Sequence, residues 1–363
     1  MRAVRFMDLR INEDERGKLL DSINKVFDSG YFINGVELES FEKEIASFHQ
    51  REYAVGVCSG TGSLYYALRA LGIGSGDEVI TTALSWIATA NAIACTGAIP
   101  IFADINEDLN LNPKSVESLI TSKTKAILPV HYAGRVCEIE EILAIARKHN
   151  LLVIEDASQA IGARRNGVLA GSFGDVACFS LNPMKVLGAL GEAGVILCDK
   201  EAIQEKIKIL RYNGTIHKET CVEISMNGRM DTLQAAILLE RLKTFERIIK
   251  KRQAIAYKYH EALRDVVEIP LEKNGESNSW YSYTIQTDAR DGLKEFLEQN
   301  GIETKIQHPI LMPMQPAYQK YTTADISNAK RIVERILCIP AHEKLTEQEQ
   351  DYVIDKIRKF YGR

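Results

Sequence analysis

Side chains capable of chemistry follow apolar segments that are predicted to be buried strands. The segment 151–156 ends in a carboxylate, Asp156, and Gln159 lies just beyond it. The segment 176–180 is followed by a loop that carries an amine, Lys185. Open parallel sheets bind ligands beyond the carboxyl ends of their strands, so we expect these side chains to meet at one edge.

Small residues and an aromatic ring are predicted at the same edge. The strand predicted over 53–57 runs into a turn that opens a helix, Gly60-Thr61-Gly62. Trp86 follows the strand predicted over 78–82, and Ser180 ends the strand that precedes Lys185. Taken singly, the turn is explained by helix capping and Trp86 by packing. Together with an acid and an amine, they form a set of groups with a common chemistry.

This set matches what pyridoxal phosphate (PLP) needs from a protein. The PLP aldehyde requires a lysine, here Lys185, and the pyridine nitrogen requires a carboxylate partner, here Asp156. The phosphate requires backbone N–H groups and hydroxyls at a helix N-terminus, and the ring can stack on an aromatic side chain. The sequence therefore predicts a PLP site at this edge of the sheet.

Short apolar segments alternate with amphipathic helical patterns between about residues 50 and 200. Seven of these segments are predicted as strands: 53–57, 78–82, 100–105, 125–130, 151–156, 176–180 and 194–199. Alternation of this kind predicts an α/β fold with a mainly parallel sheet that helices cover on both faces.

The second part of the chain has a different pattern. Residues 232–263 are predicted as one long helix, whose run Lys250-Lys251-Arg252 is expected on a solvated face. A strand is predicted over 280–287, and helices over 291–299, 327–337 and 346–360. We expect a large PLP-binding domain over residues 1–245, including the N-terminal segment, and a smaller α+β domain over 246–363.

Composition excludes several classes of function. The 363 residues carry 45 Lys and Arg against 49 Asp and Glu, a net charge of −4, which gives no basic footprint for nucleic acid. No apolar segment is long and uninterrupted enough to span a bilayer. The histidines show no metal-ligand spacing, so no metal is expected. Buried free thiols are expected for Cys178 and Cys198, and they favour a cytoplasmic protein.

In chain order, the segments resemble the DegT/DnrJ/EryC1/StrS family of PLP-dependent sugar aminotransferases. The resemblance covers nearly the whole sequence and includes the blocks SGTGSLYYALRALGIGSGDEVITT, IEDASQAIGA, GSFGDVACFSLNPMKVLGALGEAGVI and NGRMDTLQAAIL. It implies the aspartate-aminotransferase (type I) fold, with PLP as the cofactor. It also implies transfer of an amino group from L-glutamate to a keto group of a nucleotide-linked sugar, in polysaccharide, glycan or antibiotic biosynthesis.

The resemblance gives roles to the residues at the predicted site. It implies that Lys185 is the Schiff-base lysine, that Asp156 pairs with the pyridine nitrogen, and that Gln159 reaches the ring hydroxyl. Trp86 would stack on the ring. The phosphate would be held by the turn and a hydroxyl at the neighbouring strand end: Gly60, Thr61, Gly62 and Ser180.

Three further residues are implied in contacts with a partner subunit or the substrates. Asn227 would reach the phosphate bound by the neighbouring subunit, which implies a homodimer with composite active sites. Arg229 would meet a substrate carboxylate, with a plain ion pair at a helix start as the alternative. His308 would line the sugar-nucleotide pocket, with a turn residue before Pro309 as the alternative.

Departures from the family pattern leave alternative functions open. Ala193 stands where the family usually has a glycine, and the segment FSLNPMK is less aromatic than usual, which concerns the pocket wall. Lys185 is retained where related sugar dehydratases carry histidine, so the sequence favours an aminotransferase. The alternatives are amination of a keto-cyclitol, sugar dehydration, and a non-catalytic regulatory protein that binds PLP.

Overall fold

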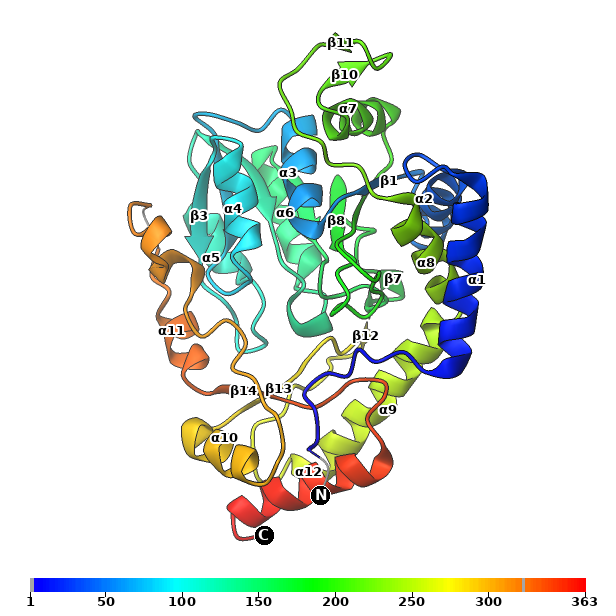
Figure 1. The fold of residues 1–363 in the computed structure, drawn as a ribbon. Coiled ribbons are helices and arrows are strands. Elements are labelled where there is room, and N and C mark those ends of the chain that lie inside the picture. Colours follow the sequence, from blue (N-terminus) through cyan, green and yellow to red (C-terminus); the bar gives the residue numbers. More distant parts are fainter. Residues whose placement is uncertain (1–2, 322–323) are drawn as a thin grey trace.

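The computed structural model describes residues 3–321 and 324–363, and its centre is a seven-stranded sheet (Figure 1). The strand order is β1-β9-β8-β5-β4-β2-β3. The bounds are β1 Tyr53–Val57, β2 Glu78–Thr82, β3 Ile99–Ala103, β4 Thr124–Leu128, β5 Leu152–Asp156, β8 Val176–Ser180 and β9 Gly194–Cys198. All seven predicted strands are therefore confirmed, with ends that differ by two residues at most.

Strand direction places the chemistry-bearing loops at one edge of the sheet. The five strands from β8 to β3 pair in parallel, whereas β9 is antiparallel to both β8 and β1. The carboxyl ends of β5 and β8 consequently lie side by side, with Asp156 opposite Cys178. The prediction of a mainly parallel sheet is confirmed, and the antiparallel β9 brings Gly194 opposite Ser180.

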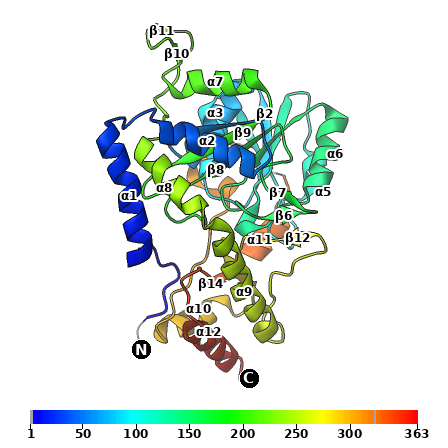
Figure 2. The same cartoon turned by 90° about the vertical axis from the view of Figure 1, so that its right-hand side faces the viewer.

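Helices cover both faces of the sheet, as predicted (Figures 1 and 2). One face packs against α3 (Gly60–Ala70), α4 (Ala88–Cys95) and α7 (Glu201–Arg211). The other packs against α2 (Val36–Phe48), α5 (Pro113–Ser118), α6 (Ile139–His149) and α8 (Thr232–Leu242). Alternate side chains of each strand enter the two cores, as the period of two in a strand requires.

A smaller unit with its own core follows the large sheet (Figure 2). It contains α9 (Phe245–Leu263), α10 (Arg290–Gln299), α12 (Glu347–Phe360) and an antiparallel pair, β13 (Tyr283–Gln286) and β14 (Ile336–Ile339). Its core also takes in Val4 near the N-terminus, whereas Phe245 and Ile249 of α9 belong to the core of the large unit. The division between residues 245 and 246 stays a prediction.

Two predicted elements were wrong in their extent. Residues 232–263 form two helices, because the chain leaves helical geometry at Thr244, where φ is −113° and ψ is 6°. The helix predicted over 327–337 ends at Val333 as α11 (Ser327–Val333), and β14 follows it. In both places the observed arrangement buries apolar side chains in a core whose other residues lie far away in the chain, and the local sequence pattern does not reveal that core.

The remaining elements are short or peripheral. Helix α1 spans Glu13–Ser29, and the one-turn helices are η1 Tyr132–Gly134, η2 Met312–Met314 and η3 Pro316–Tyr318. The small strands are β6 Arg164–Arg165, β7 Val168–Leu169, β10 Thr215–Ile216, β11 Thr220–Cys221 and β12 Glu276–Ser277. None of the helices in the described ranges is long and apolar enough to cross a membrane.

Candidate active site

The turn that opens α3 is built as an anion-binding helix start. Ser59 caps the helix, because its hydroxyl accepts a hydrogen bond from the N–H of Gly62 at 3.0 Å. Thr61 is exposed at this first turn, where unpaired N–H groups and the helix dipole favour a negative charge. The predicted phosphate residues therefore stand at a helix N-terminus that is open to a ligand.

The same turn is in close contact with the ends of β8 and β9. A Cβ atom on Gly60 would lie 2.5 Å from the Cβ of Ser180, and one on Gly194 would lie 2.3 Å from the carbonyl oxygen of Ser59. Only glycine leaves room for this approach. The structure thus brings together the predicted glycines, Thr61 and Ser180.

Asp156 lies buried at the end of β5, and neutral donors hold its carboxylate. Thr89 at the start of α4 donates from Oγ1 to Oδ2 at 2.8 Å, and the N–H of Ser158 donates to Oδ1 at 3.2 Å. The Thr89 hydroxyl also lies 3.1 Å from the hydroxyl of Ser85. Across the described ranges, Asp156 forms no ion pair with Lys, Arg or His within 4.0 Å, so its charge remains free for a cationic ligand atom.

The adjacent Glu155 points to the opposite face of β5 and has a structural task. Its carboxylate accepts hydrogen bonds from His131 Nε2 at 2.8 Å and from the N–H groups of Gly171, Phe173 and Gly174. Burial raises the pKa of Glu155, but these bonds outweigh burial and bring the pKa below its ordinary value. The sequence pair Glu155-Asp156 therefore separates into a carboxylate that holds a loop and one that faces the site.

Gln159 is buried one turn beyond Asp156 and fixes the neighbouring loop. Its Oε1 accepts a hydrogen bond from the N–H of Ala133 at 3.0 Å, and Gln307 approaches the same oxygen at 3.5 Å. Ala133 has a positive φ of 58°, a conformation that this bond helps to hold. The loop 132–134 is consequently a fixed wall beside Gln159.

Lys185 lies in the loop between β8 and β9 and is half-buried. Its Nζ lies 4.5 Å from the centre of the Tyr281 ring, which comes from the segment before β13. In residues 3–321 and 324–363 no carboxylate forms an ion pair with it. Tyr281 is a site residue that sequence reasoning missed, because only the fold brings it to Lys185.

Trp86 and His308 form the opposite side of the site. Trp86 is 62% exposed, and its ring centre lies 6.0 Å from that of His308. The Nδ1 of His308 lies 3.1 Å from the hydroxyl of Tyr132. Burial, with the nearby charges of Lys185 and Lys305, lowers the pKa of His308 to about 3. A neutral His308 can therefore accept a hydrogen bond from Tyr132, which the sequence did not single out.

Asn227 and Arg229 lie beside β1 and the cap of α3. Arg229 forms an antiparallel β-bridge with Val57, and the carbonyl oxygen of Gly228 accepts a hydrogen bond from the backbone N–H of Cys58 at 2.8 Å. Arg229 donates from Nε to Oδ1 of the exposed Asn227 at 2.9 Å, and its guanidinium lies 4.4 Å from the centre of the Tyr212 ring. No carboxylate pairs with Arg229 among the described residues.

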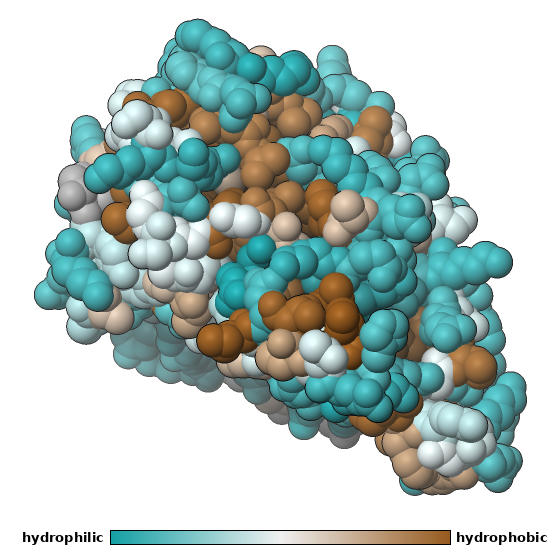
Figure 3. All heavy atoms as spheres, turned by 90° about the horizontal axis from the view of Figure 1, so that it is seen from above, coloured by the Kyte–Doolittle hydropathy of each residue, from teal (hydrophilic) through white to brown (hydrophobic). Residues whose placement is uncertain are grey.

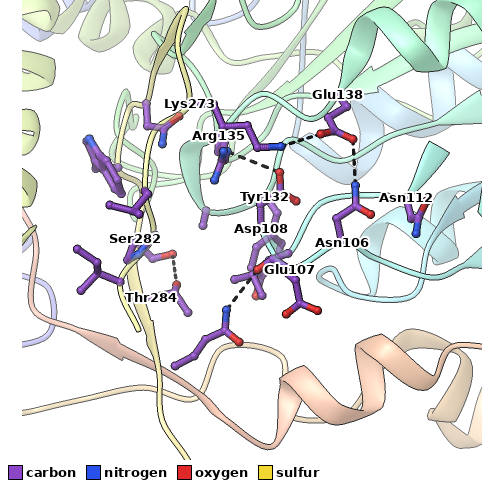
Figure 4. A pocket seen from close by; sticks show the side chains of 18 of the residues that line it. Asn106, Glu107, Asp108, Asn112, Tyr132, Arg135, Glu138, Lys273, Ser282 and Thr284 are labelled. Atoms are coloured by element: carbon purple, nitrogen blue, oxygen red, sulfur yellow. Dashed lines mark hydrogen bonds and ion pairs between the residues drawn. The ribbon is translucent and has the colours of Figure 1, made fainter. Parts of the chain in front are cut away.

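A cavity lies on the other side of the loop 132–134. Its volume is about 670 Å³, and Figure 4 shows Tyr132 and Arg135 on one wall with Ser282 and Thr284 on the other. None of the predicted site residues lines it. Two of its basic side chains are already paired, Arg135 with Glu276 at 2.7 Å and Lys273 with Glu138 at 2.7 Å. The predicted chemistry is therefore assembled at the sheet edge and not in this cavity.

Metal-binding groups are not assembled at this site. No group of three or more His, Cys, Asp or Glu side chains that could hold a metal ion occurs in the part of the chain that the structure describes. Cys178 and Cys198 are free and buried, as the sequence predicted. The functional groups at the sheet edge are thus an amine, a carboxylate, an amide, hydroxyls and aromatic rings.

The sequence and structure are similar to characterised proteins over their full length. The model of the DegT/DnrJ/EryC1/StrS aminotransferase family matches residues 13–358. The chain is 37% identical to the "Pleiotropic regulatory protein" of Geobacillus stearothermophilus, over 96% of each chain. It is 34% identical to the dTDP-3-amino-3,4,6-trideoxy-alpha-D-glucose transaminase of Streptomyces venezuelae, over 99% of this chain and 97% of the relative.

A solved structure gives the same result. The crystal structure of DesV from S. venezuelae, in complex with a ketimine intermediate, superposes with a TM-score of 0.97 at 34% identity and 100% coverage of both chains. The predicted type I fold, the aminotransferase class and PLP as the cofactor are thereby confirmed. A match of the family model to 13–358 leaves only the two ends of the chain outside. The chain belongs to the DegT/DnrJ/EryC1/StrS aminotransferase family.

Proposed function

We propose that this enzyme moves an amino group from L-glutamate to a keto group of a nucleotide-linked sugar and so makes an amino sugar for polysaccharide, glycan or antibiotic biosynthesis. The observation that carries the proposal is that Lys185 and Asp156 lie at the same sheet edge and that neither forms an ion pair among the described residues. The similarity to a transaminase of a dTDP-linked sugar supports the substrate class.

The residues at the sheet edge fit PLP. Asp156 has only neutral donors, so its charge is available to a protonated ring nitrogen. The open turn at Thr61, with Ser180, would hold the phosphate, and Gln159 would meet the ring hydroxyl. The exposed face of Trp86 would cover the ring. When bound, PLP supplies an aldehyde for the amino group and a ring that withdraws electrons.

Lys185 would hold PLP through its side-chain amine. The same amine, when it is not bonded to the cofactor, would act as a general base and then as an acid, taking and returning the proton that transamination moves. This task requires an amine that is free to move to the reacting atoms. No carboxylate among the described residues holds the amine of Lys185 in an ion pair, which meets that requirement.

Two groups would meet the substrates: Trp86 with His308, and Arg229 beside Asn227. The guanidinium of Arg229 has no carboxylate partner among the described residues, so it suits the carboxylate of L-glutamate. His308 is neutral, and the rotation of its ring is restrained by Tyr132, so it suits the uncharged hydroxyls of a sugar. These two assignments rest on the available hydrogen-bonding groups and on the family.

The surface around Asn227 supports the proposal of a homodimer. Exposed apolar side chains gather in two segments, with Tyr31, Phe32 and Val36 in one and Val222, Ile224 and Met226 in the other. Ile33 forms an antiparallel β-bridge with Asp231, so the first segment lies beside the part of the chain that carries Asn227 and Arg229. Brown patches on the upper face in Figure 3 show apolar side chains at the surface. Apolar surface of this kind supports an interface between two copies that share their sites.

The free thiols of the chain support a reducing compartment, and we place the enzyme in the cytoplasm.

Amination of a keto-cyclitol would use the same groups, so candidate keto substrates must be compared directly. A regulatory role is favoured by one observation, the name of the Geobacillus relative. The retained Lys185 and Asp156 favour catalysis, because together they supply the amine and the carboxylate that transamination on PLP needs.

Visible absorption of the purified protein tests the proposal. Bound PLP should give a yellow band that L-glutamate bleaches and that a keto nucleotide sugar restores, with an amino sugar as the product. Lys185→Ala and Lys185→Arg should fold but show no turnover. Turnover in either variant would contradict the assignment of Lys185, and a glutamate-insensitive band with DNA binding would favour the regulatory role.

A further inference from the structure

Tyr281 lies between the cavity of Figure 4 and the predicted site around Lys185. Trp280, Ser282 and Thr284 line the cavity of Figure 4, whereas Tyr281 lies between them and its ring contacts Lys185. Tyr281 itself does not line this cavity. Its ring packs against the core of the large unit, although the residue belongs to the segment of the small one.

The backbone around Tyr281 is held in an unusual conformation. Trp280 has a positive φ of 51°, which is uncommon for a large side chain. Gly134 lies against it, since a Cβ atom there would be 2.6 Å from the nitrogen of Tyr281, and its carbonyl accepts a hydrogen bond from Ser279 at 2.9 Å. Strain of this kind persists only where the surroundings fix it.

Arg252 supplies part of that restraint. This arginine was predicted on a solvated helix face, but it is only 3% exposed, because it points from α9 into the junction with the segment 280–281. Its Nη1 donates to the carbonyl oxygen of Trp280 at 2.9 Å, and its Nη2 donates to Glu343 at 2.7 Å. A charged hydrogen bond therefore fixes the backbone that directs Tyr281 at Lys185.

We propose that the ring of Tyr281 receives the ammonium group of Lys185 whenever that lysine is not bonded to the cofactor. The 4.5 Å distance between Nζ and the ring centre is that of a cation–π contact. Such a contact holds the cation near the site, but less firmly than a buried carboxylate would, so the lysine can leave it and transfer its proton. The inference rests on the role of Lys185 in the proposed function.

Labelling of the cofactor-free protein tests the contact without any turnover. Trinitrobenzenesulfonate reacts only with neutral amines, and peptide mass spectrometry reports the rate at Lys185, with the exposed Lys250 as an internal reference. Tyr281→Leu and Tyr281→Met remove the ring, and they should speed labelling of Lys185 about threefold to tenfold. Tyr281→Phe keeps the ring face and should label within about twofold of the wild type. Tyr257→Leu, at an exposed site on the same helix as Arg252, is the control.

Two results would overturn the proposal. One is unchanged labelling of Lys185 in both ring-free variants, and the other is a Tyr281→Phe protein that labels as fast as they do. Circular dichroism of each variant shows that it is folded, and Tyr281→Met takes the place of Tyr281→Leu if leucine prevents folding. The labelling needs no keto sugar or glutamate, so failure of the proposed reaction would be seen separately.

Discussion

The carboxylate of Asp156 is held by a hydroxyl that comes from a helix far away in the chain. Thr89 donates to Oδ2 at 2.8 Å, and both residues are buried. Thr89→Val keeps the shape of the side chain but removes the donor, which leaves a buried carboxylate with one hydrogen bond fewer. We expect PLP to bind about tenfold more weakly, because one lost hydrogen bond to a charged group is worth about 1.5 kcal/mol.

Titration of the cofactor-free protein with PLP, followed by absorbance, measures that change. Thr96→Val is a matched control, because Thr96 ends the same helix and its hydroxyl bonds only to Ile93 at 2.7 Å and to the N–H of Ala98. Equal affinity in Thr89→Val and Thr96→Val would show that the Thr89 hydroxyl does not orient Asp156.

Residue types after strand ends, together with the family resemblance, were the basis for predicting Lys185 and Asp156, and the structure places the two residues after neighbouring strands. Thr89, Tyr132 and Tyr281 were not predictable in the same way. Their hydroxyls and rings meet the site only after elements far apart in the chain have packed. Arg252 shows the opposite error, since a run of basic residues on a helix indicates solvent, whereas the fold buries one of them.

At the scale of elements, the sheet was predictable and the connections were not. Strands of a sheet that helices cover on both faces have apolar runs that a single sequence displays, and all seven were located. The end of α8 at Leu242 has no glycine or proline to mark it. The helical pattern over 327–337 hides β14, whose hydrogen-bonding partner, β13, lies about 50 residues earlier.

The contact between the α3 turn and β9 makes a prediction at this scale. Gly194→Ala places a methyl group against the carbonyl of Ser59, at 2.3 Å, so the turn must move away from the strand ends. We expect a loss of about 1–3 kcal/mol in the free energy of unfolding and weaker binding of inorganic phosphate and PLP. Urea denaturation and PLP titration measure the two effects.

Gly17→Ala serves as the comparison, because nothing lies within 4 Å of a Cβ atom at this position of α1. That substitution should stabilise the chain by about 0.5–1 kcal/mol, since alanine has less freedom to lose in a helix. If Gly194→Ala binds PLP as well as Gly17→Ala does, the close approach of β9 has no part in the phosphate site.

His49, which is buried, and His308, which is partly buried, make the stability of the whole molecule depend on pH. Burial lowers the pKa of His49 to about 4, and burial with nearby lysines lowers that of His308 to about 3. In the unfolded chain the pKa of both histidines is about 6.5. Below that pH the unfolded state therefore binds protons that the folded state does not bind. The free energy of unfolding should therefore fall as the pH drops from about 6.5 towards 4, by about 1.4 kcal/mol per pH unit for each histidine.

Urea denaturation at several pH values checks this slope. His49→Gln should reduce it by about 1.4 kcal/mol per pH unit, because glutamine does not titrate. His217→Asn changes an exposed histidine with a positive φ, which asparagine tolerates, and it should leave the slope unchanged. Identical slopes in the wild type and His49→Gln would mean that His49 is protonated in the folded protein.

At the scale of the whole molecule, the proposed homodimer with shared active sites can be tested by mixing two inactive variants. If Asn227 completes the site of the partner subunit, a hybrid of Lys185→Ala and Asn227→Ala subunits contains one site with both residues intact. When the two variants pair at random, about half of the dimers are hybrids, and each hybrid has one intact site of its two. Mixing should therefore restore about a quarter of the wild-type rate. Light scattering must show a dimer under the same conditions. If Asn227 instead serves its own subunit, every site in the hybrid lacks one of the two residues, and the mixture stays as inactive as its parents.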